Sequence, residues 1–251
     1  MKRFLTILLV LLVLAASAHA SPLTLLEDYA NSVIIPWDEN DPSAGRFEYS
    51  YCYPHVDENE EGGDNINVFY QDLIDYSVSF TIPMIRDAFE GADAATIISY
   101  QVTCNNDDYF SVLIRTERTN PDQSIVFWEG QVFSRKNGSP GLTYTLPKLL
   151  GTLASNESDT WLQDRQTEKA DALIREMVWD RIEESGTEAG FPADFSEEML
   201  SGIFFPEQDF YLDENGDPVF FLQPGDVFGD SAGDRELIVF PISLEEILDE
   251  L

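Results

Sequence analysis

Histidine, the side chain best suited to proton transfer near neutral pH, is scarce in this chain. Only His19 and His55 occur, and His19 lies in the N-terminal apolar segment described below. A catalytic triad would combine His55 with a serine and an acid, but the Gly-x-Ser-x-Gly pattern that exposes such a serine is absent. No two histidines have the spacing of a zinc site. His55 follows Pro54 beside an acidic segment, so we predict a solvated loop histidine, no catalytic residue, no metal site and no cofactor.

Carboxylates are the abundant reactive groups, with 47 Asp and Glu residues in all. Cleavage of a glycosidic bond needs two carboxyl groups at a defined separation. Any fold would bring some of these 47 to that separation, so their abundance identifies no pair. Asp213, Asn215 and Asp217 resemble the start of a calcium loop, but Pro218 and Pro224 stand where an EF-hand requires Gly and Glu. We therefore predict a plain hairpin turn at this point.

The two cysteines, Cys52 and Cys104, both lie in strand-like runs of residues. An oxidising compartment would allow such a pair to bond. We predict a disulfide between two neighbouring strands, which would stabilise the fold by roughly 4 kcal/mol in the chain-entropy description. The alternative is two buried free thiols.

The first twenty residues have the pattern of a cleavable signal peptide. Lys2 and Arg3 precede an almost wholly apolar run over 4–16, and Ala18 and Ala20 supply the small residues that signal peptidase reads. The run is shorter than the ~20 residues of a membrane span, and no later stretch approaches that length. We expect a mature protein that starts near Ser21, has no membrane span and is exported to the periplasm or beyond the cell.

Net charge limits the partners of the mature chain. Removal of Lys2 and Arg3 leaves 12 basic residues against 47 acidic ones, a net charge of about −35. Nucleic acid, whose binding requires clustered Lys and Arg, is thereby disfavoured, and an anionic membrane surface would repel the chain. A cationic partner would be attracted. The alternative is that the acidity serves solubility alone.

Hydrophobic periodicity and turn signals predict the elements that hold these residues. We expect a flexible N-terminal segment over 21–45 and one α+β domain over 46–251. The first half of this domain should hold a strand near 47–56, a helix over 66–80 that Pro83 bends or ends, and three sequential strands over 96–104, 109–119 and 124–134.

The second half should begin with a short strand over 142–146, followed by a helix over 160–184 and another near 196–200. Asn215-Gly216 between apolar runs predicts a hairpin over 209–223. A strand over 236–240 and a last helix, with Ser243 and Glu246 as its capping box, complete the chain. The fold class is α+β: an antiparallel sheet, made of a meander and a C-terminal hairpin, with helices packed on one face.

Three stretches of the sequence together resemble one known family. They are Tyr53-Pro54 with Ile66-Asn67 beyond an acidic loop; Gly-Leu-Thr-Tyr-Thr-Leu at 141–146 ahead of Leu149-Leu150; and Asp-Phe-Tyr-Leu-Asp at 209–213, followed by Phe-Phe-Leu at 220–222, Ala232-Gly233 and Ile-Val-Phe-Pro at 238–241. These stretches resemble the paired domain found in the extracytoplasmic part of the RsiV anti-sigma factor and beside the catalytic domain of the PdaC peptidoglycan deacetylase. The two family segments would cover about 46–145 and 146–251.

This resemblance implies an exported bacterial α+β module without catalytic activity, and RsiV-like members of the family bind lysozyme. The family's Gly-Gly-Ala-His loop is absent where 122–130 stands. We expect a binding module of the cell envelope whose partner is a lysozyme-like cationic protein or a peptidoglycan fragment. The alternatives are a carboxylate-dependent hydrolase of cell-wall glycans and a structural envelope protein.

Overall fold

The computed structural model describes residues 21–88, 91–136, 138–152, 160–185, 190–229, 232 and 235–251. The signal peptide predicted for 1–20 lies outside these residues. Among the described residues, no helix has the length and apolar character needed to cross a membrane.

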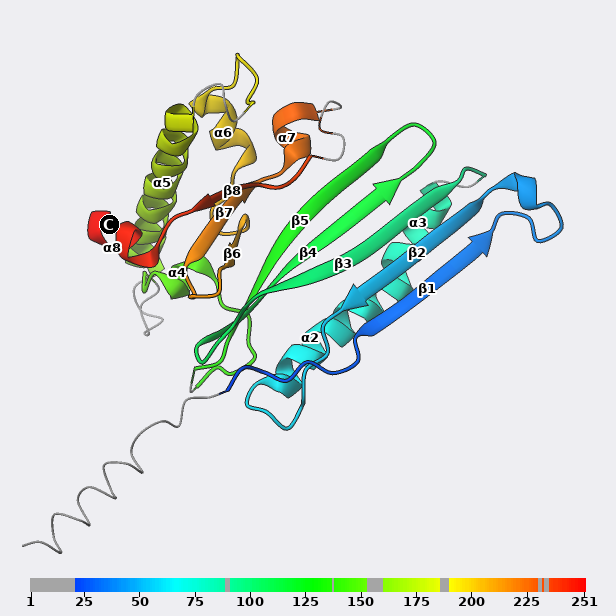
Figure 1. Cartoon of the computed structure of the whole chain (residues 1–251), viewed down its shortest axis with the longest axis horizontal. Helices are drawn as coiled ribbons and strands as arrows, with labels where there is room; N and C mark the ends of the chain where they lie inside the picture. Colours follow the sequence, from blue (N-terminus) through cyan, green and yellow to red (C-terminus); the bar gives the residue numbers. More distant parts are fainter. Residues whose placement is uncertain are drawn as a thin grey trace, which may run out of the picture.

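A five-stranded sheet in the order β1-β2-β3-β4-β5 forms the larger layer (Figure 1). Its strands are β1 (Tyr29–Pro36), β2 (Arg46–Tyr53), β3 (Ala94–Asn105), β4 (Tyr109–Thr119) and β5 (Ser124–Ser134). The predicted meander is confirmed, since β3, β4 and β5 pair antiparallel in sequence. The expectation of an antiparallel sheet is wrong at one place, because β2 and β3 pair in parallel. Parallel neighbours need a long crossover, and the helices between β2 and β3 supply it.

The segment 21–45, predicted to be flexible, contains β1, which pairs antiparallel with β2 along its whole length. A short 3₁₀ turn, η1 (Pro42–Ala44), connects the two strands. The prediction failed because Asn31, Ser32 and Pro36 are typical of loops, whereas pairing with β2 supplies the stability that local propensity does not.

Helices α2 (Gly63–Tyr76) and α3 (Ile82–Ala88), joined by the π-helical turn η2 (Ser77–Thr81), cover one face of the sheet (Figure 1). They bury apolar residues such as Ile66 and Tyr70 against Phe47 and Phe110 of the strands. Pro83 does not end this helical stretch, which continues to Ala88. It directly follows the π-helical turn, in which the Ile82 N–H donates to the Ser77 carbonyl, so its missing N–H falls beside that wider turn inside a continuous helical stretch.

The C-terminal half builds a second, three-stranded antiparallel sheet in the order β6-β7-β8. Its elements are α4 (Leu146–Leu149), α5 (Thr160–Ser185), α6 (Glu197–Ile203), β6 (Phe210–Leu212), β7 (Pro218–Leu222), α7 (Pro224–Phe228), β8 (Ile238–Pro241) and α8 (Leu244–Glu250). The predicted hairpin is present, with Gly216 in the left-handed region at φ 90°. The strand predicted over 142–146 is reduced to one bridge between Phe133 and Thr143, because Leu146 already begins α4.

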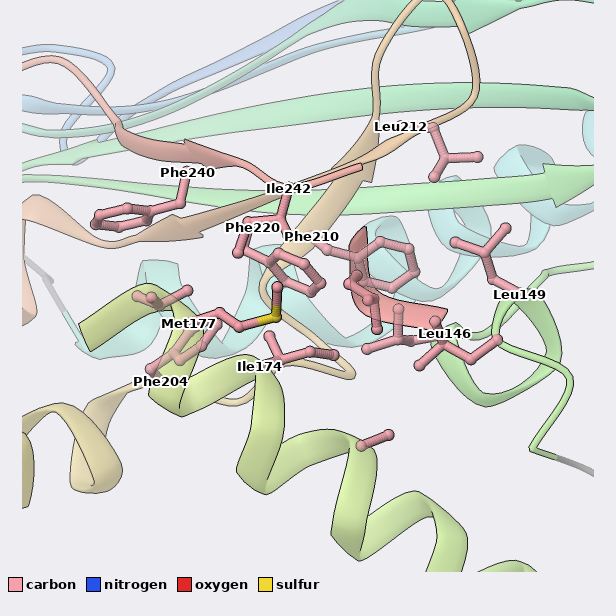
Figure 2. Close-up of a cluster of buried hydrophobic side chains, with 14 of the residues drawn as sticks. Leu146, Leu149, Ile174, Met177, Phe204, Phe210, Leu212, Phe220, Phe240 and Ile242 are labelled. Atoms are coloured by element: carbon pink, nitrogen blue, oxygen red, sulfur yellow. The ribbon is translucent and has the colours of Figure 1, made fainter. Parts of the chain in front are cut away.

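A second apolar core lies between this small sheet and α5 (Figure 2). Ile174 and Met177 of α5 point at Phe220 of β7, and Phe204 closes the cluster from the end of α6. Each fully buried side chain of this size contributes about 1.5–3 kcal/mol. The predicted α+β fold class is therefore confirmed, with two cores of which each has its own helices.

The two sheets meet where β6 crosses β4 and β5. The backbone N–H of Leu212 donates to Oγ of Ser111 at 3.0 Å, in a buried position. An ideal Cβ on Gly130 would lie only 1.7 Å from the carbonyl oxygen of Phe210. Gly130 thus marks a close backbone approach between the two sheets.

Candidate functional site

A hollow of about 680 Å³ lies at one end of the five-stranded sheet. Side chains alternate across a strand, so Glu48 points away from the face on which Phe47 and Tyr49 pack against the helices. The hollow therefore opens on the face that α2 and α3 do not cover. It is lined by Ile34, Pro36, Gly45, Arg46, Glu48, Asp93, Ala94, Ala95, Thr119, Asn120 and Pro121.

Short-range contacts hold the walls of this hollow in place. Gly45 has φ 85°, and a Cβ there would stand 3.2 Å from the Trp37 ring. The Trp37 indole N–H donates to the carbonyl of Ala92 at 2.5 Å, and the backbone N–H of Arg46 donates to the Asp93 carboxylate at 2.9 Å. These bonds join the β1–β2 connection to the start of β3, so the hollow is preformed.

Acidic residues precede and follow β1, and those that follow it come next to Pro36, at the end of the strand that lines the hollow. The segment 21–45 holds Glu27, Asp28, Asp38, Glu39 and Asp41 and no Lys or Arg. Hydrogen bonds from the side chain and backbone N–H of Ser43 hold the pKa of Asp41 below its usual value, so this carboxylate is charged at neutral pH. A cationic ligand that approaches β1 meets negative charge at both ends of the strand.

Among the residues that the structure describes, Arg46 is the one basic residue that lines the hollow, and it forms an ion pair with Glu48. Its guanidinium lies 4.0 Å from the Glu48 carboxylate, and its side chain is 63% exposed. An exposed pair of this kind contributes about 0–1 kcal/mol. The Glu48 carboxylate also accepts a hydrogen bond from Oγ of Ser50 at 3.2 Å.

The residues that line the hollow do not combine a nucleophile with a base. The carboxylates of the hollow are those of Glu48 and Asp93, and each already accepts a hydrogen bond. Across the described residues, no group of three or more His, Cys, Asp or Glu side chains is placed to hold a metal ion.

His55, the one histidine predicted in the mature chain, lies away from this hollow. Its ring stacks on Tyr29 at a centroid distance of 4.3 Å, and Nδ1 lies 3.0 Å from the carbonyl oxygen of Glu27. Tyr29 is the first residue of β1, and Glu27 lies just before it. His55 therefore fastens the N-terminal segment to the end of β2.

The predicted disulfide between Cys52 and Cys104 is not formed, and both residues are free thiols. Tyr51 lies opposite Ile98 in the parallel pairing of β2 with β3, so Cys104 stands about five residues farther along β3 than the position opposite Cys52. At 3.3 Å per residue, the separation is about 16 Å. A disulfide allows no more than about 7 Å between Cα atoms. The strands are neighbours as predicted, but their register keeps the cysteines apart.

The two thiols occupy different environments. The Cys52 Sγ lies 3.4 Å from the Asp28 carboxylate, which also accepts a hydrogen bond from the Tyr100 hydroxyl at 2.5 Å. Burial and then this carboxylate raise the pKa of Cys52. Cys104 belongs to the second core, where burial raises its pKa to about 11. Neither thiol is activated as a nucleophile.

Among the carboxylates in the part of the chain that the structure describes, Asp209 has the pKa that departs furthest from its ordinary value. Burial raises its pKa to about 6, although the backbone N–H of Phe205 donates to it at 2.7 Å. Burial also raises the pKa of Asp226 nearby. Both lie in the C-terminal half, away from the hollow, and Asp209 closes the turn between α6 and β6. Sequence reasoning had no signal for either, because their burial depends on contacts between distant segments.

The sequence alone identified none of the residues that line the hollow, and those of β1 were hidden furthest. Ile34 and Pro36 line the hollow, yet the segment was predicted to be flexible. The available signal was the short β-branched run Val33, Ile34 and Ile35, which the surrounding Asn, Ser and Pro residues concealed.

Comparison with known proteins identifies the fold. No protein-family model matches the sequence, and no curated protein matches it. A solved structure of a DUF3298 family member from Bacteroides fragilis is similar, with a TM-score of 0.58 and 10% identity over 93% of this chain and 94% of that one. A DUF3298 family protein from Pseudomonas aeruginosa is similar with a TM-score of 0.51 and 9% identity, over 91% of this chain and 94% of that one. At these identities the likeness shows a shared fold, and both bacterial neighbours belong to a family of unknown function.

Proposed function

We propose that this protein is an exported, non-catalytic binding module of the bacterial cell envelope, and that its ligand is a cationic protein of the lysozyme type. The observation that carries the proposal is the preformed hollow of about 680 Å³ beside a segment, 21–45, with five acidic and no basic residues. The lining supplies shape and charge without a nucleophile and base.

Long-range attraction supports a protein ligand over a neutral glycan. A mature chain of about −35 net charge draws a basic protein toward itself, which raises the rate of encounter. Salt screens this attraction over a Debye length of about 8 Å at physiological ionic strength. A fitted interface at the hollow would retain part of the affinity when salt rises, whereas charge attraction alone would vanish.

Calorimetric titration with a cationic lysozyme at low and at physiological salt tests the proposal. Binding should weaken as salt rises and persist at physiological salt, and an equally basic unrelated protein should bind only at low salt. Equal binding of both proteins would refute a specific receptor. Release of soluble fragments from purified cell walls, measured in parallel, would favour the hydrolase instead.

Two matched double variants test whether the ligand binds beside β1. Glu27 and Glu39 are exposed and flank β1, and Glu183 and Glu184 are exposed on α5 in the other half. Glu27→Gln with Glu39→Gln removes the same charge as Glu183→Gln with Glu184→Gln. Each carboxylate about 8 Å from a separate basic side chain of the ligand contributes about 0.5 kcal/mol in water, so loss of both costs about 1 kcal/mol, or about fivefold in affinity. Only the first pair should show this loss, and equal losses would refute the proposed position.

A further inference from the structure

The two edge strands of the five-stranded sheet differ in how far other parts of the chain cover them. An edge strand exposes unpaired N–H and C=O groups, which proteins commonly cover. Along β5, Val132 and Ser134 bond to the backbone of 141–144. Farther along, the Gln223 side chain accepts from the Trp128 N–H at 3.0 Å and donates to its carbonyl at 2.7 Å, as a paired strand would.

The other edge, β1, has a strand on one side only within the described part of the chain (Figure 1). Trp37 N–H donates to the Gly45 carbonyl at 3.2 Å, so this pair is hydrogen-bonded. In an antiparallel ladder such pairs alternate with non-bonded ones. The backbone groups of Ala30, Ser32 and Ile34 therefore point outward, away from β2.

Two details agree with this direction. Pro36 falls in the same outward-facing set, where its missing N–H costs the β1–β2 ladder nothing. The Ser32 N–H bonds at 2.8 Å to the side-chain oxygen of its neighbour Asn31, an exposed and local substitute for a strand partner. An incoming strand would displace this side chain.

β1 has few of the features that usually keep an edge strand from pairing with another chain. Edge strands are commonly protected by charged residues, prolines, bulges or shortness. β1 has eight residues, pairs with β2 in unbroken register, carries no charged side chain and has a proline only at its end.

We propose that β1 binds an extended segment of a basic protein by strand addition, so that the sheet gains a sixth strand. This proposal rests on the proposed function: the outer edge of β1 would be the surface that contacts the basic protein. Main-chain hydrogen bonds to Ala30, Ser32 and Ile34 would supply affinity, as in other strand-addition complexes. The side chain opposite Ile34 would lie on the same sheet face, at the hollow that Ile34 and Pro36 line.

The charge pattern of the edge defines the ligand. Glu27 and Asp28 precede β1, Asp38 and Glu39 follow it, and the strand between them is uncharged. Eight residues of β1 span about 26 Å at 3.3 Å each. The complementary ligand is a strand of about six uncharged, β-prone residues with Lys or Arg at each end.

A second copy of this chain fits this edge poorly. In an antiparallel pairing of two β1 strands, Glu27 and Asp28 of each copy would face Asp38 and Glu39 of the other. Like charges placed opposite each other destabilise strand pairing, and each whole chain already carries a formal charge of −33. The partner is therefore a different, basic chain.

Amide hydrogen exchange followed by NMR tests the proposal with the peptide Lys-Lys-Thr-Val-Thr-Val-Thr-Val-Lys-Lys. At saturation, exchange of the Ala30, Ser32 and Ile34 amides should slow by about tenfold or more, while Val33 and Ile35, already bonded to β2, change little. The same peptide with alternate amides N-methylated should give no protection. Peptide binding without protection of the three outward amides would overturn strand addition.

Ser32→Pro and Ser32→Ala form the matched variants. Both lose the Ser32 hydroxyl bond to Ser50, but only Ser32→Pro also removes the outward N–H. Ser32→Pro should bind the peptide about fivefold more weakly than Ser32→Ala, the equivalent of one hydrogen bond of about 1 kcal/mol. Ala30→Pro gives the same test if Ser32→Pro unfolds. Equal affinities would refute the edge as the site.

These measurements distinguish failure of strand addition from failure of lysozyme binding. Lysozyme binding that is retained in Ser32→Pro, with normal folding, would keep the proposed function and refute β1 as its contact. Outward amides that are protected without peptide and become exposed on dilution would show pairing of two copies and overturn the basic-partner proposal. Peptide protection without lysozyme binding would support strand addition and refute lysozyme as the ligand.

Discussion

Gly130→Ala should be among the most damaging single-methyl additions to this fold. The new Cβ would stand 1.7 Å from the Phe210 carbonyl oxygen and 2.7 Å from its carbon. Both obstacles are backbone, so no side-chain rotation relieves the overlap. β5 and β6 must separate, which also strains the hydrogen bond from Leu212 to Ser111.

We estimate the cost from these contacts. Overpacking a rigid site typically costs about 1–3 kcal/mol, and loss of a buried hydrogen bond adds about 1 kcal/mol. Urea unfolding followed by circular dichroism should therefore show a free energy of unfolding lower by about 2–4 kcal/mol. Gly202→Ala is the matched control, since Gly202 is in α6 and a Cβ added there would meet no heavy atom within 4 Å outside the neighbouring helix backbone. That variant should gain up to about 1 kcal/mol from helix propensity. A Gly130→Ala protein as stable as wild type would refute the close contact between the two sheets.

Two further predictions concern titratable side chains. Because burial raises the folded-state pKa of Asp209 to about 6, its contribution to stability is complete below pH 3.8 and is lost as pH rises through 6. Asp209→Asn should thus stabilise the protein at pH 7–8, by about 1–2 kcal/mol after allowance for partial exposure, and the gain should shrink toward zero near pH 4; a gain that grows on acidification would contradict the burial argument. Cys52 and Cys104 should both react with an alkylating reagent after unfolding of the exported protein without reductant, as mass spectrometry would show; a mass lower by two hydrogens, with no labelling, would contradict the register of β2 with β3.

Features that depend on neighbouring residues were predicted well from the sequence. Ser243 caps α8 by accepting the N–H of Glu246, as its spacing indicated, although the Glu246 side chain pairs with Arg181 and does not complete the capping box. Asn215-Gly216 forms the hairpin turn, because its backbone conformation favours glycine whatever the surroundings. The apolar stripe of α5 and the three strands of the meander were also recognised, because the local spacing of apolar residues and turn residues indicates them.

Features that depend on which strands become neighbours were predicted less well. The strand-like runs around Cys52 and Cys104 suggested two adjacent strands, and adjacency is correct. Only the parallel direction and register of β2 and β3 decide that the thiols are far apart. Local patterns of alternation are the same for parallel and antiparallel pairing, so composition does not distinguish them.

The sequence by itself determined the periodic helices, the tight turns and the acidity, because each is a property of residue type and local spacing. Tertiary structure decided that β1 is an ordered strand, that its outer edge stays unpaired and that it borders the hollow. It also decided that Gln223 closes the opposite edge, 95 residues away from Trp128 in the chain. These outcomes depend on long-range pairing, whose free energy comes from partners that a local pattern does not contain.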